Sequence, residues 1–162
     1  MQRLNVGCGA DYREGWVNLD WDFYDKNLKA DIYFDLNDIY KGKKLPFEEN
    51  HFEGIIMYDV LEHFPEPLPI LKELYRVCKM NGFIIIKVPC GRWVWDNLDH
   101  KHQFNFNSFN VANFNNYTSN DDKRVKIIYR KVYVMPSRNF LFKVLRYVFG
   151  KVNLEIMFKK IK

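Results

Sequence analysis

The sequence has only three cysteines among 162 residues, and they are scattered at positions 8, 78 and 90. Their number and spacing exclude a disulfide framework and a cysteine-based zinc site. No apolar run approaches the roughly 18 residues that a membrane-spanning helix needs. Residues 1–5 lead directly into a strand-like segment, so we expect no signal peptide. These absences predict a reduced, cytoplasmic protein without a transmembrane segment.

The sequence also lacks internal repeats and low-complexity linkers. Its length is typical of one domain, and 48% hydrophobic with 28% charged residues is a globular composition. We therefore expect a single domain over residues 1–162.

Charge is distributed unevenly along the chain. Residues 1–122 carry 13 Lys and Arg against 19 Asp and Glu, whereas residues 123–162 carry 12 against Glu155 alone. A basic segment of this kind can bind nucleic acid, an anionic membrane surface or an anionic substrate. A compositional bias explains it slightly better, because the chain is rich in Lys and Asn and has only three alanines.

Hydrophobic patterning predicts strands that alternate with helices. A helix is expected from Glu66 to Met80, with Asn81 and Gly82 as its C-terminal stop. Further helices are expected over 108–116 and 138–149. Strands are expected over 3–6, 17–20, 31–35, 53–59, 83–88, 124–134 and 154–161. This order predicts an α/β fold with an open, mostly parallel seven-stranded sheet, helices on both faces and one antiparallel strand near the C-terminus.

A glycine turn follows the first strand, where Gly7 and Gly9 would let a ligand approach the backbone. The dinucleotide-binding fingerprint needs a third glycine at position 12, which is Tyr12. It also needs an acidic residue about 20 positions after the first glycine, and Asp20 follows Gly7 by only 13. A phosphate-binding loop is excluded because no Lys-Ser/Thr pair follows the glycines.

Several blocks occur in one order over residues 3–109. They are Leu4-Asn5-Val6-Gly7-Cys8-Gly9, Gly15-Trp16-Val17-Asn18-Leu19-Asp20, Leu45-Pro46-Phe47 with Phe52-Glu53-Gly54-Ile55-Ile56 and Val60-Leu61-Glu62-His63-Phe64, and Leu74-Tyr75-Arg76-Val77-Cys78-Lys79-Met80-Asn81-Gly82. In combination they resemble the small class I S-adenosylmethionine-dependent methyltransferases of the type 11 kind. The resemblance implies a Rossmann-like fold, with a cofactor-binding half over 1–90 and an acceptor-side half over 91–162.

The resemblance also implies roles for individual residues in binding S-adenosylmethionine. Gly7, Cys8 and Gly9 would face its methionine end, and Asp20 would accept hydrogen bonds from the ribose hydroxyls. The remaining contacts would come from Asp35 and Leu36 at the adenine and from Tyr58 and Asp59 at the sulfonium side. Since Asp20 is read as an exposed strand-end carboxylate, we expect it to support binding but not folding.

One spacing departs from the family pattern. Only seven residues separate Gly9 from Val17, whereas a parallel crossover usually takes a dozen or more. We therefore expect a loop or a single turn in place of the first helix, and a cofactor pocket that is more open than usual.

The acceptor side carries two weak candidates for a general base. His100 and His102 follow the fifth strand and could deprotonate an acceptor, or simply form local hydrogen bonds in a polar loop. Trp93 and Trp95 could wall the acceptor pocket or close the core. The Asp59-x-x-Glu62-His63 cluster resembles a divalent-metal motif of some quinone-precursor methyltransferases, but charge at a helix N-terminus explains it better, so we expect no metal site.

Three functions therefore stay open. The first is methyl transfer to a small-molecule acceptor, for which the basic segment favours an anionic one. The second is a non-catalytic partner subunit of the same fold, and the third is a nucleic-acid methyltransferase that uses the basic C-terminal third. The apolar side of residues 140–149 would serve as core or as a homodimer contact, with a membrane-surface role as an alternative.

Overall fold

The computed structural model describes residues 2–21, 29–91, 94, 97–109, 125–134 and 152–161. The elements in chain order are β1 (Arg3–Val6), β2 (Val17–Asp20), β3 (Ile32–Tyr33), the 3-10 helix η1 (Leu36–Lys41), β4 (Phe52–Tyr58), the 3-10 helix η2 (Leu61–His63), α1 (Pro67–Val77), β5 (Cys78–Cys90), β6 (Val125–Val134) and β7 (Val152–Lys160).

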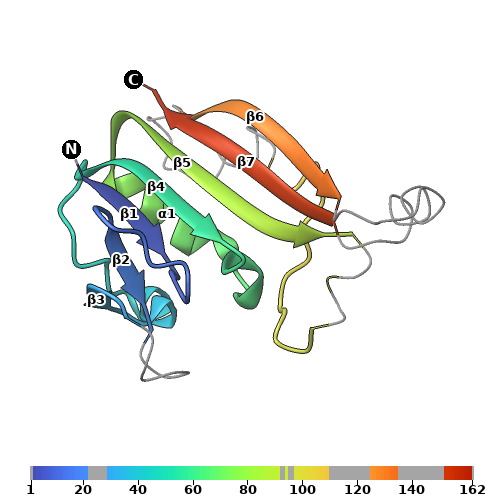
Figure 1. Cartoon of the computed structure of the whole chain (residues 1–162), viewed down its shortest axis with the longest axis horizontal. Helices are drawn as coiled ribbons and strands as arrows, with labels where there is room; N and C mark the ends of the chain where they lie inside the picture. Colours follow the sequence, from blue (N-terminus) through green and yellow to red (C-terminus); the bar gives the residue numbers. More distant parts are fainter. Residues whose placement is uncertain are drawn as a thin grey trace.

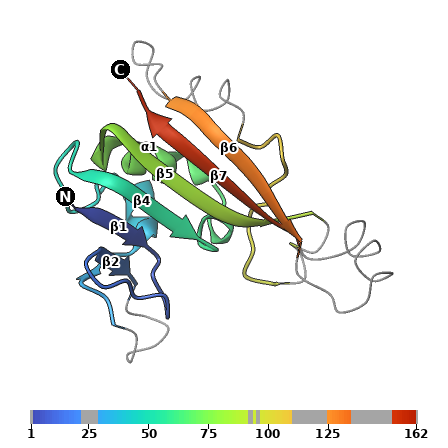
Figure 2. The ribbon, with the colours of Figure 1, turned by 45° about the horizontal axis from the view of Figure 1, so that its top comes forward.

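The strands form one seven-stranded sheet in the order β3-β2-β1-β4-β5-β7-β6 (Figures 1 and 2). The pairs from β3 to β5 are all parallel, and β7 runs antiparallel to both of its neighbours. The predicted Rossmann-like sheet with one antiparallel strand near the C-terminus is confirmed. The helix expected over 138–149 lies outside the described residues, as does the helix expected over 108–116 from residue 110 on; residues 108 and 109 belong to a turn.

One face of the sheet is buried beneath α1, which lies behind the strands in Figure 1. The helix places Ile70, Leu71, Leu74 and Val77 in the core, each at most 5% exposed. They join strand residues that share this face by register, namely Leu4, Val6, Ile55, Met57, Ile84, Ile86, Leu154, Ile156 and Phe158. Burial of this apolar surface is the main force that holds α1 on the sheet. No helix of the described residues is long and apolar enough to cross a membrane.

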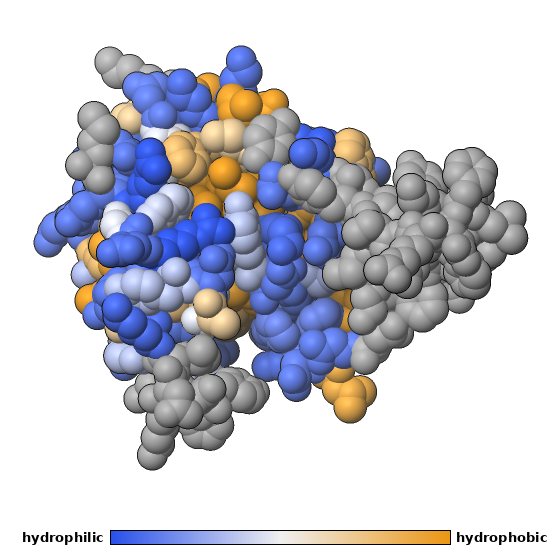
Figure 3. All heavy atoms as spheres, in the orientation of Figure 1, coloured by the Kyte–Doolittle hydropathy of each residue, from blue (hydrophilic) through white to orange (hydrophobic). Residues whose placement is uncertain are grey.

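The opposite face is less deeply buried at β5 and β7, whereas Ile56 of the adjoining β4 is 1% exposed. Ile85 of β5 and Met157 of β7 are register partners on this face, and both are only half-buried. Apolar residues are accordingly visible in the middle of the face that Figure 3 presents, between hydrophilic surroundings. This face therefore offers apolar surface that α1 does not cover.

The crossover from β1 to β2 is a series of turns, as its short spacing predicted. Two buried amides on neighbouring strands hold it. Asn5 donates to the carbonyl of Asp11 over 2.7 Å, and Asn18 donates to those of Arg13 and Trp16 over 2.9 and 3.1 Å. Buried backbone groups of a loop need such partners because no helix satisfies them.

The end of α1 differs from the prediction. The helix stops at Val77 rather than near Met80, because Cys78 is already extended (ψ 133°) and pairs with Phe52 of β4. The buried Lys160 ammonium also donates to the Cys78 carbonyl over 3.0 Å. Asn81, at φ +63°, lies within β5 and is not the helix stop. Strand pairing and a distant lysine thus override the local stop signal.

Candidate functional site

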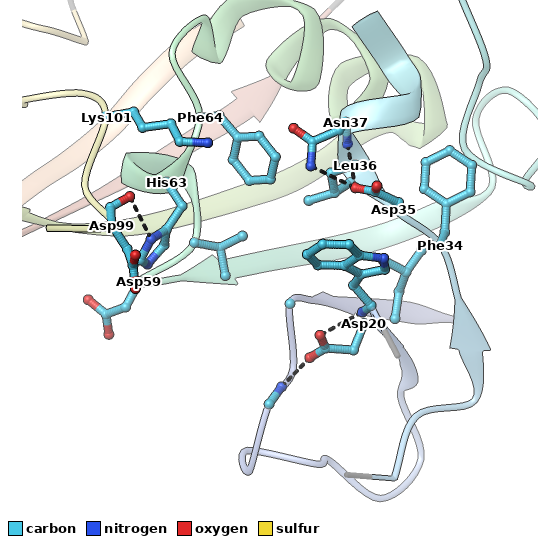
Figure 4. A pocket seen from close by; sticks show the side chains of 15 residues that line it. Asp20, Phe34, Asp35, Leu36, Asn37, Asp59, His63, Phe64, Asp99 and Lys101 are labelled. Carbon is cyan, nitrogen blue, oxygen red and sulfur yellow. Dashed lines mark hydrogen bonds between the residues drawn. The ribbon is translucent and has the colours of Figure 1, made fainter. Parts of the chain in front are cut away.

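A cavity of about 410 Å³ opens at the carboxyl ends of β1, β2 and β4 (Figure 4). Ligands in open α/β sheets bind at this end of the strands, and the volume is ordinary for a small-molecule pocket. The sequence-predicted residues on its wall are Gly7, Gly9, Asp20, Asp35, Leu36 and Asp59; the others are Leu19, Trp21, Phe34, Asn37, Val60, His63, Phe64, Asp99 and Lys101.

Gly7 forms part of the wall where no side chain fits. Its φ is +65°, and a Cβ atom there would lie 2.3 Å from Cγ2 of Val60. The Gly7 amide donates to the Leu19 carbonyl over 2.8 Å. The turn is therefore fastened to β2 while its bare backbone stays packed against Val60, which also lines the cavity.

The Asp20 carboxylate accepts hydrogen bonds from two backbone amides. Its Oδ2 accepts from the Gly9 amide over 2.5 Å and its Oδ1 from the Trp21 amide over 2.6 Å. A carboxylate has about four acceptor sites, so each oxygen retains one for a ligand hydroxyl. Asp20 is half-buried rather than exposed, and its carboxylate holds the glycine turn in place, so we expect it to support local stability as well as binding.

Asp35 and Leu36 lie where η1 begins. Asp35 caps that helix, and its Oδ1 accepts from both the backbone and the side-chain nitrogen of Asn37 over 2.8 Å. Leu36 is 6% exposed and, with Phe34, gives this part of the wall an apolar surface. A flat heterocycle can pack here with a fixed carboxylate at its edge.

Two of the predicted cofactor residues are not on the wall. Cys8 is buried behind the turn, where burial and the neighbouring Asp20 raise the pKa of its thiol to about 12. The Tyr58 ring interacts with Arg13 and Lys87, whose cationic groups lie 5.3 and 5.2 Å from its centre.

Asp59 does line the cavity. Its backbone is held at φ +55° by a hydrogen bond to Lys87, whose ammonium also pairs with its carboxylate over 2.7 Å.

The loop after β5 reaches the same end of the sheet. Asp99 and Lys101 line the cavity, and the Asp99 carbonyl lies 3.3 Å from Nδ1 of His63 (Figure 4). His100 and His102 do not line it: His100 packs against His63, with ring centres 5.0 Å apart, and His102 packs on Phe104 at 4.6 Å. Trp93 and Trp95 lie outside the described residues.

Glu62 belongs to the Asp59-x-x-Glu62-His63 motif and is only 1% exposed. Burial raises the pKa of its carboxyl to about 7, and burial also lowers the pKa of His63. Oε1 of Glu62 lies 4.0 Å from Nε2 of His100, and its Oε2 has no hydrogen-bond partner within the described part of the chain. A buried carboxylate in this state is costly and points to a missing partner.

Most of the other residues on the cavity wall were not predicted from the sequence. Trp21 and Phe34 are direct neighbours of Asp20 and Asp35, so their position at strand ends was an available signal. His63, Phe64 and Lys101 could be found only from the fold, because two distant segments meet there.

The electrostatics of the wall favour a cationic ligand. Among the described lining residues are four aspartates and one lysine, Lys101; a second ammonium, that of Lys87, pairs with Asp59. In a partly enclosed site, carboxylates attract positive charge more strongly than in open water.

Comparison with solved structures agrees with this fold. A SAM-dependent methyltransferase from Archaeoglobus fulgidus is 16% identical with a TM-score of 0.63, and the match covers 98% of this chain and 86% of that one. A methyltransferase of Haloferax volcanii, in complex with the Trm112 activator, is 13% identical with a TM-score of 0.61 over 99% and 83%. The [4+2]-cyclase SpnF is 13% identical with a TM-score of 0.61 over 99% and 75%.

No curated protein matches the sequence significantly. The family model described as a methyltransferase domain matches residues 4–86, a little over half of the chain, including the glycine turn and three strands of the cavity wall. The chain therefore belongs to the methyltransferase-domain family.

Proposed function

We propose that this chain transfers the methyl group of S-adenosylmethionine to a small-molecule acceptor. The proposal rests on three groups that meet on the cavity wall. They are the bare backbone of Gly7, the strand-end carboxylate of Asp20 with acceptor sites for a ligand, and the apolar surface of Phe34 and Leu36. These are the groups that an amino-acid portion, a ribose and an adenine require.

We expect the donor to lie along the wall in one direction. Gly7 and Gly9 would meet its methionine portion, and Asp20 its ribose hydroxyls. Leu36 and Asp35 would contact the adenine. Asp59 would lie at the sulfonium side. The donor carries a sulfonium and an ammonium against one carboxylate, so its net positive charge suits the four aspartates of the wall.

The reaction needs little from the protein beyond positioning. The acceptor's lone pair forms the new bond to carbon while the carbon–sulfur bond breaks and its electron pair goes to sulfur. Holding the two groups in line and free of water supplies much of the acceleration. The acceptor would enter beside Asp99 and Lys101, and the Lys101 ammonium could pair with an anionic group of the acceptor. His100 or His102 would act as a base only for an acceptor that starts protonated.

Isothermal titration with S-adenosylmethionine and S-adenosylhomocysteine tests the proposal. Saturable binding that Asp20→Ala weakens, and that the surface control Asp38→Ala leaves intact, supports the donor site. Asp38 is a suitable control because it pairs with Lys41 and Lys43 outside the cavity. A folded chain that takes up neither ligand contradicts the proposal and favours a partner-subunit function.

The partner-subunit alternative rests on the half-buried apolar face around Ile85 and Met157 and on the missing crossover helix. A similar methyltransferase was solved with an activator protein, so an activator bound to this chain is a related proposal. The nucleic-acid alternative rests on the basic segment 123–162 and predicts binding that weakens steeply with salt.

A further inference from the structure

We propose that Glu62, His63 and His100 bind one divalent transition-metal ion beside the cavity. The sequence places Glu62 and His63 in one motif with Asp59, for which we expected no metal site. The structure instead brings in His100 from the loop after β5, while the Asp59 carboxylate pairs with Lys87.

The first observation is the convergence of three donor groups. One carboxylate oxygen and two imidazole nitrogens lie within 4.8 Å of one another. Ligand atoms around a bound ion lie about 3 to 3.5 Å apart for metal–ligand distances near 2.1 Å. Side-chain rotations that move each donor atom by about 1 Å would therefore bring the three groups within bonding distance of one ion.

The second observation is independent of the clustering. Glu62 is almost fully buried, and its Oε2 has no hydrogen-bond partner among the described residues. No lysine or arginine of the described chain forms an ion pair with it, and the basic group paired with it among these residues is His100, at 4.0 Å. A cation at this point would satisfy an oxygen that the protein leaves unpaired.

The surroundings hold the histidines in a metal-binding orientation. Nδ1 of His100 bonds to the Val94 carbonyl over 2.6 Å, and Nδ1 of His63 lies 3.3 Å from the Asp99 carbonyl. Backbone carbonyls that take up Nδ1–H leave Nε2 as the ligand atom, as is usual for metal-binding histidines. The side-chain amide of Asn97, 3.3 Å from Nε2 of His100, is the contact that the ion would displace.

The backbone joins the two segments at the same point. The amides of Lys101 and His102 both donate to the carbonyl of Glu62, over 2.8 and 3.0 Å. These hydrogen bonds fix the loop against η2. The backbone therefore holds the three donor groups close to one another.

The ligand set defines the class of ion. Two imidazoles with one carboxylate suit Zn²⁺, Fe²⁺, Co²⁺ or Mn²⁺ rather than Mg²⁺ or Ca²⁺, which prefer oxygen alone. Since His63 also lines the cavity, the ion would lie at its edge. If methyl transfer is the function, the ion's free positions could hold an acceptor oxygen and lower its pKa; metal binding itself does not depend on that function.

The test uses the purified chain after treatment with a chelator, titrated with Zn²⁺ and with Co²⁺ by calorimetry and absorption. We expect one ion per chain, and a thermal unfolding midpoint that the metal raises and EDTA lowers. Glu62→Gln and His100→Asn should each weaken binding by more than about tenfold. His100→Asn can keep the hydrogen bond to Val94, and Glu62→Gln keeps the shape of the side chain.

His102→Asn is the matched control, because it removes a histidine of the same loop that is outside the cluster. The proposal is overturned if the folded wild-type chain binds metal only at millimolar concentration, or if the control weakens binding as much as the cluster variants. Because the readouts are affinity and unfolding, a chain without methyltransferase activity can still confirm or contradict the site.

Discussion

Oδ2 of Asp20 lies 2.5 Å from the amide nitrogen of Gly9, so the carboxylate at the end of β2 holds the turn at the end of β1. The two residues are 11 positions apart but belong to adjacent parallel strands. The groups that we propose for the ribose and for the methionine portion are thus parts of one hydrogen-bonded unit. Ligand affinity and local stability are consequently coupled at this point.

Asp20→Ala should weaken S-adenosylmethionine binding by about 1–3 kcal/mol, because the ribose hydroxyls lose their acceptor. The free energy of unfolding without ligand should also fall by about 1 kcal/mol or more, since the Gly9 and Trp21 amides lose theirs. Calorimetry and urea unfolding measure the two effects, with Asp38→Ala as the control. Unchanged stability of the ligand-free variant would show that the turn does not depend on Asp20.

Gly7→Ala should be more damaging than Gly9→Ala, although both glycines have positive φ. The left-handed conformation costs an alanine about 1 kcal/mol at either position. Only at Gly7 does the new methyl group also meet Val60, at 2.3 Å, whereas nothing lies within 4 Å at Gly9. Thermal unfolding and ligand titration of the two variants should separate the effects. Equal losses would mean that strain alone, and not the contact with Val60, makes Gly7 necessary.

Asp31 should contribute to the loss of stability in acid. Hydrogen bonds from Asn18 and Tyr12 lower the pKa of its carboxyl. A carboxyl whose pKa is lower in the folded state stabilises the protein above its ordinary pKa, near 4, and this contribution disappears as pH falls through the lowered value.

Asp31→Asn should therefore reduce stability at pH 7 and flatten the decline on the acid side. Tyr12→Phe, which removes one of the hydrogen bonds, should give an intermediate curve. Urea unfolding as a function of pH provides the comparison, and identical acid limbs in wild type and Asp31→Asn would contradict the assignment.

Cys8 and Cys78 should not react with thiol reagents in the folded protein. Burial raises the pKa of Cys8 to about 12 and that of Cys78 to about 11, so almost no thiolate forms at neutral pH. Titration with a disulfide reagent should report these two thiols only after denaturant is added. Rapid labelling of Cys8 in the native chain would show that the glycine turn opens readily.

The β1–β2 connection shows what local sequence can decide. Its ten residues are too few for a crossover helix, so the length of the connection alone predicts a loop. The same holds for the position of Gly7 and Asp20 on the cavity wall, since cavities of parallel sheets open at the carboxyl ends of the strands. Confirmed parts of the fold rest on hydrophobic periodicity, which determines which segments become strands.

The end of α1 and the cluster around Glu62 could not be predicted in this way. Asn81-Gly82 is a good helix stop, but Cys78 gains a β4 partner and the Lys160 ammonium, which come from positions 26 residues before and 82 residues after it. His100 joins Glu62 only because the loop after β5 folds back onto η2. Local patterns depend on neighbours along the chain, whereas strand pairing, buried charges and converging ligand groups depend on distant residues that only the tertiary structure brings together.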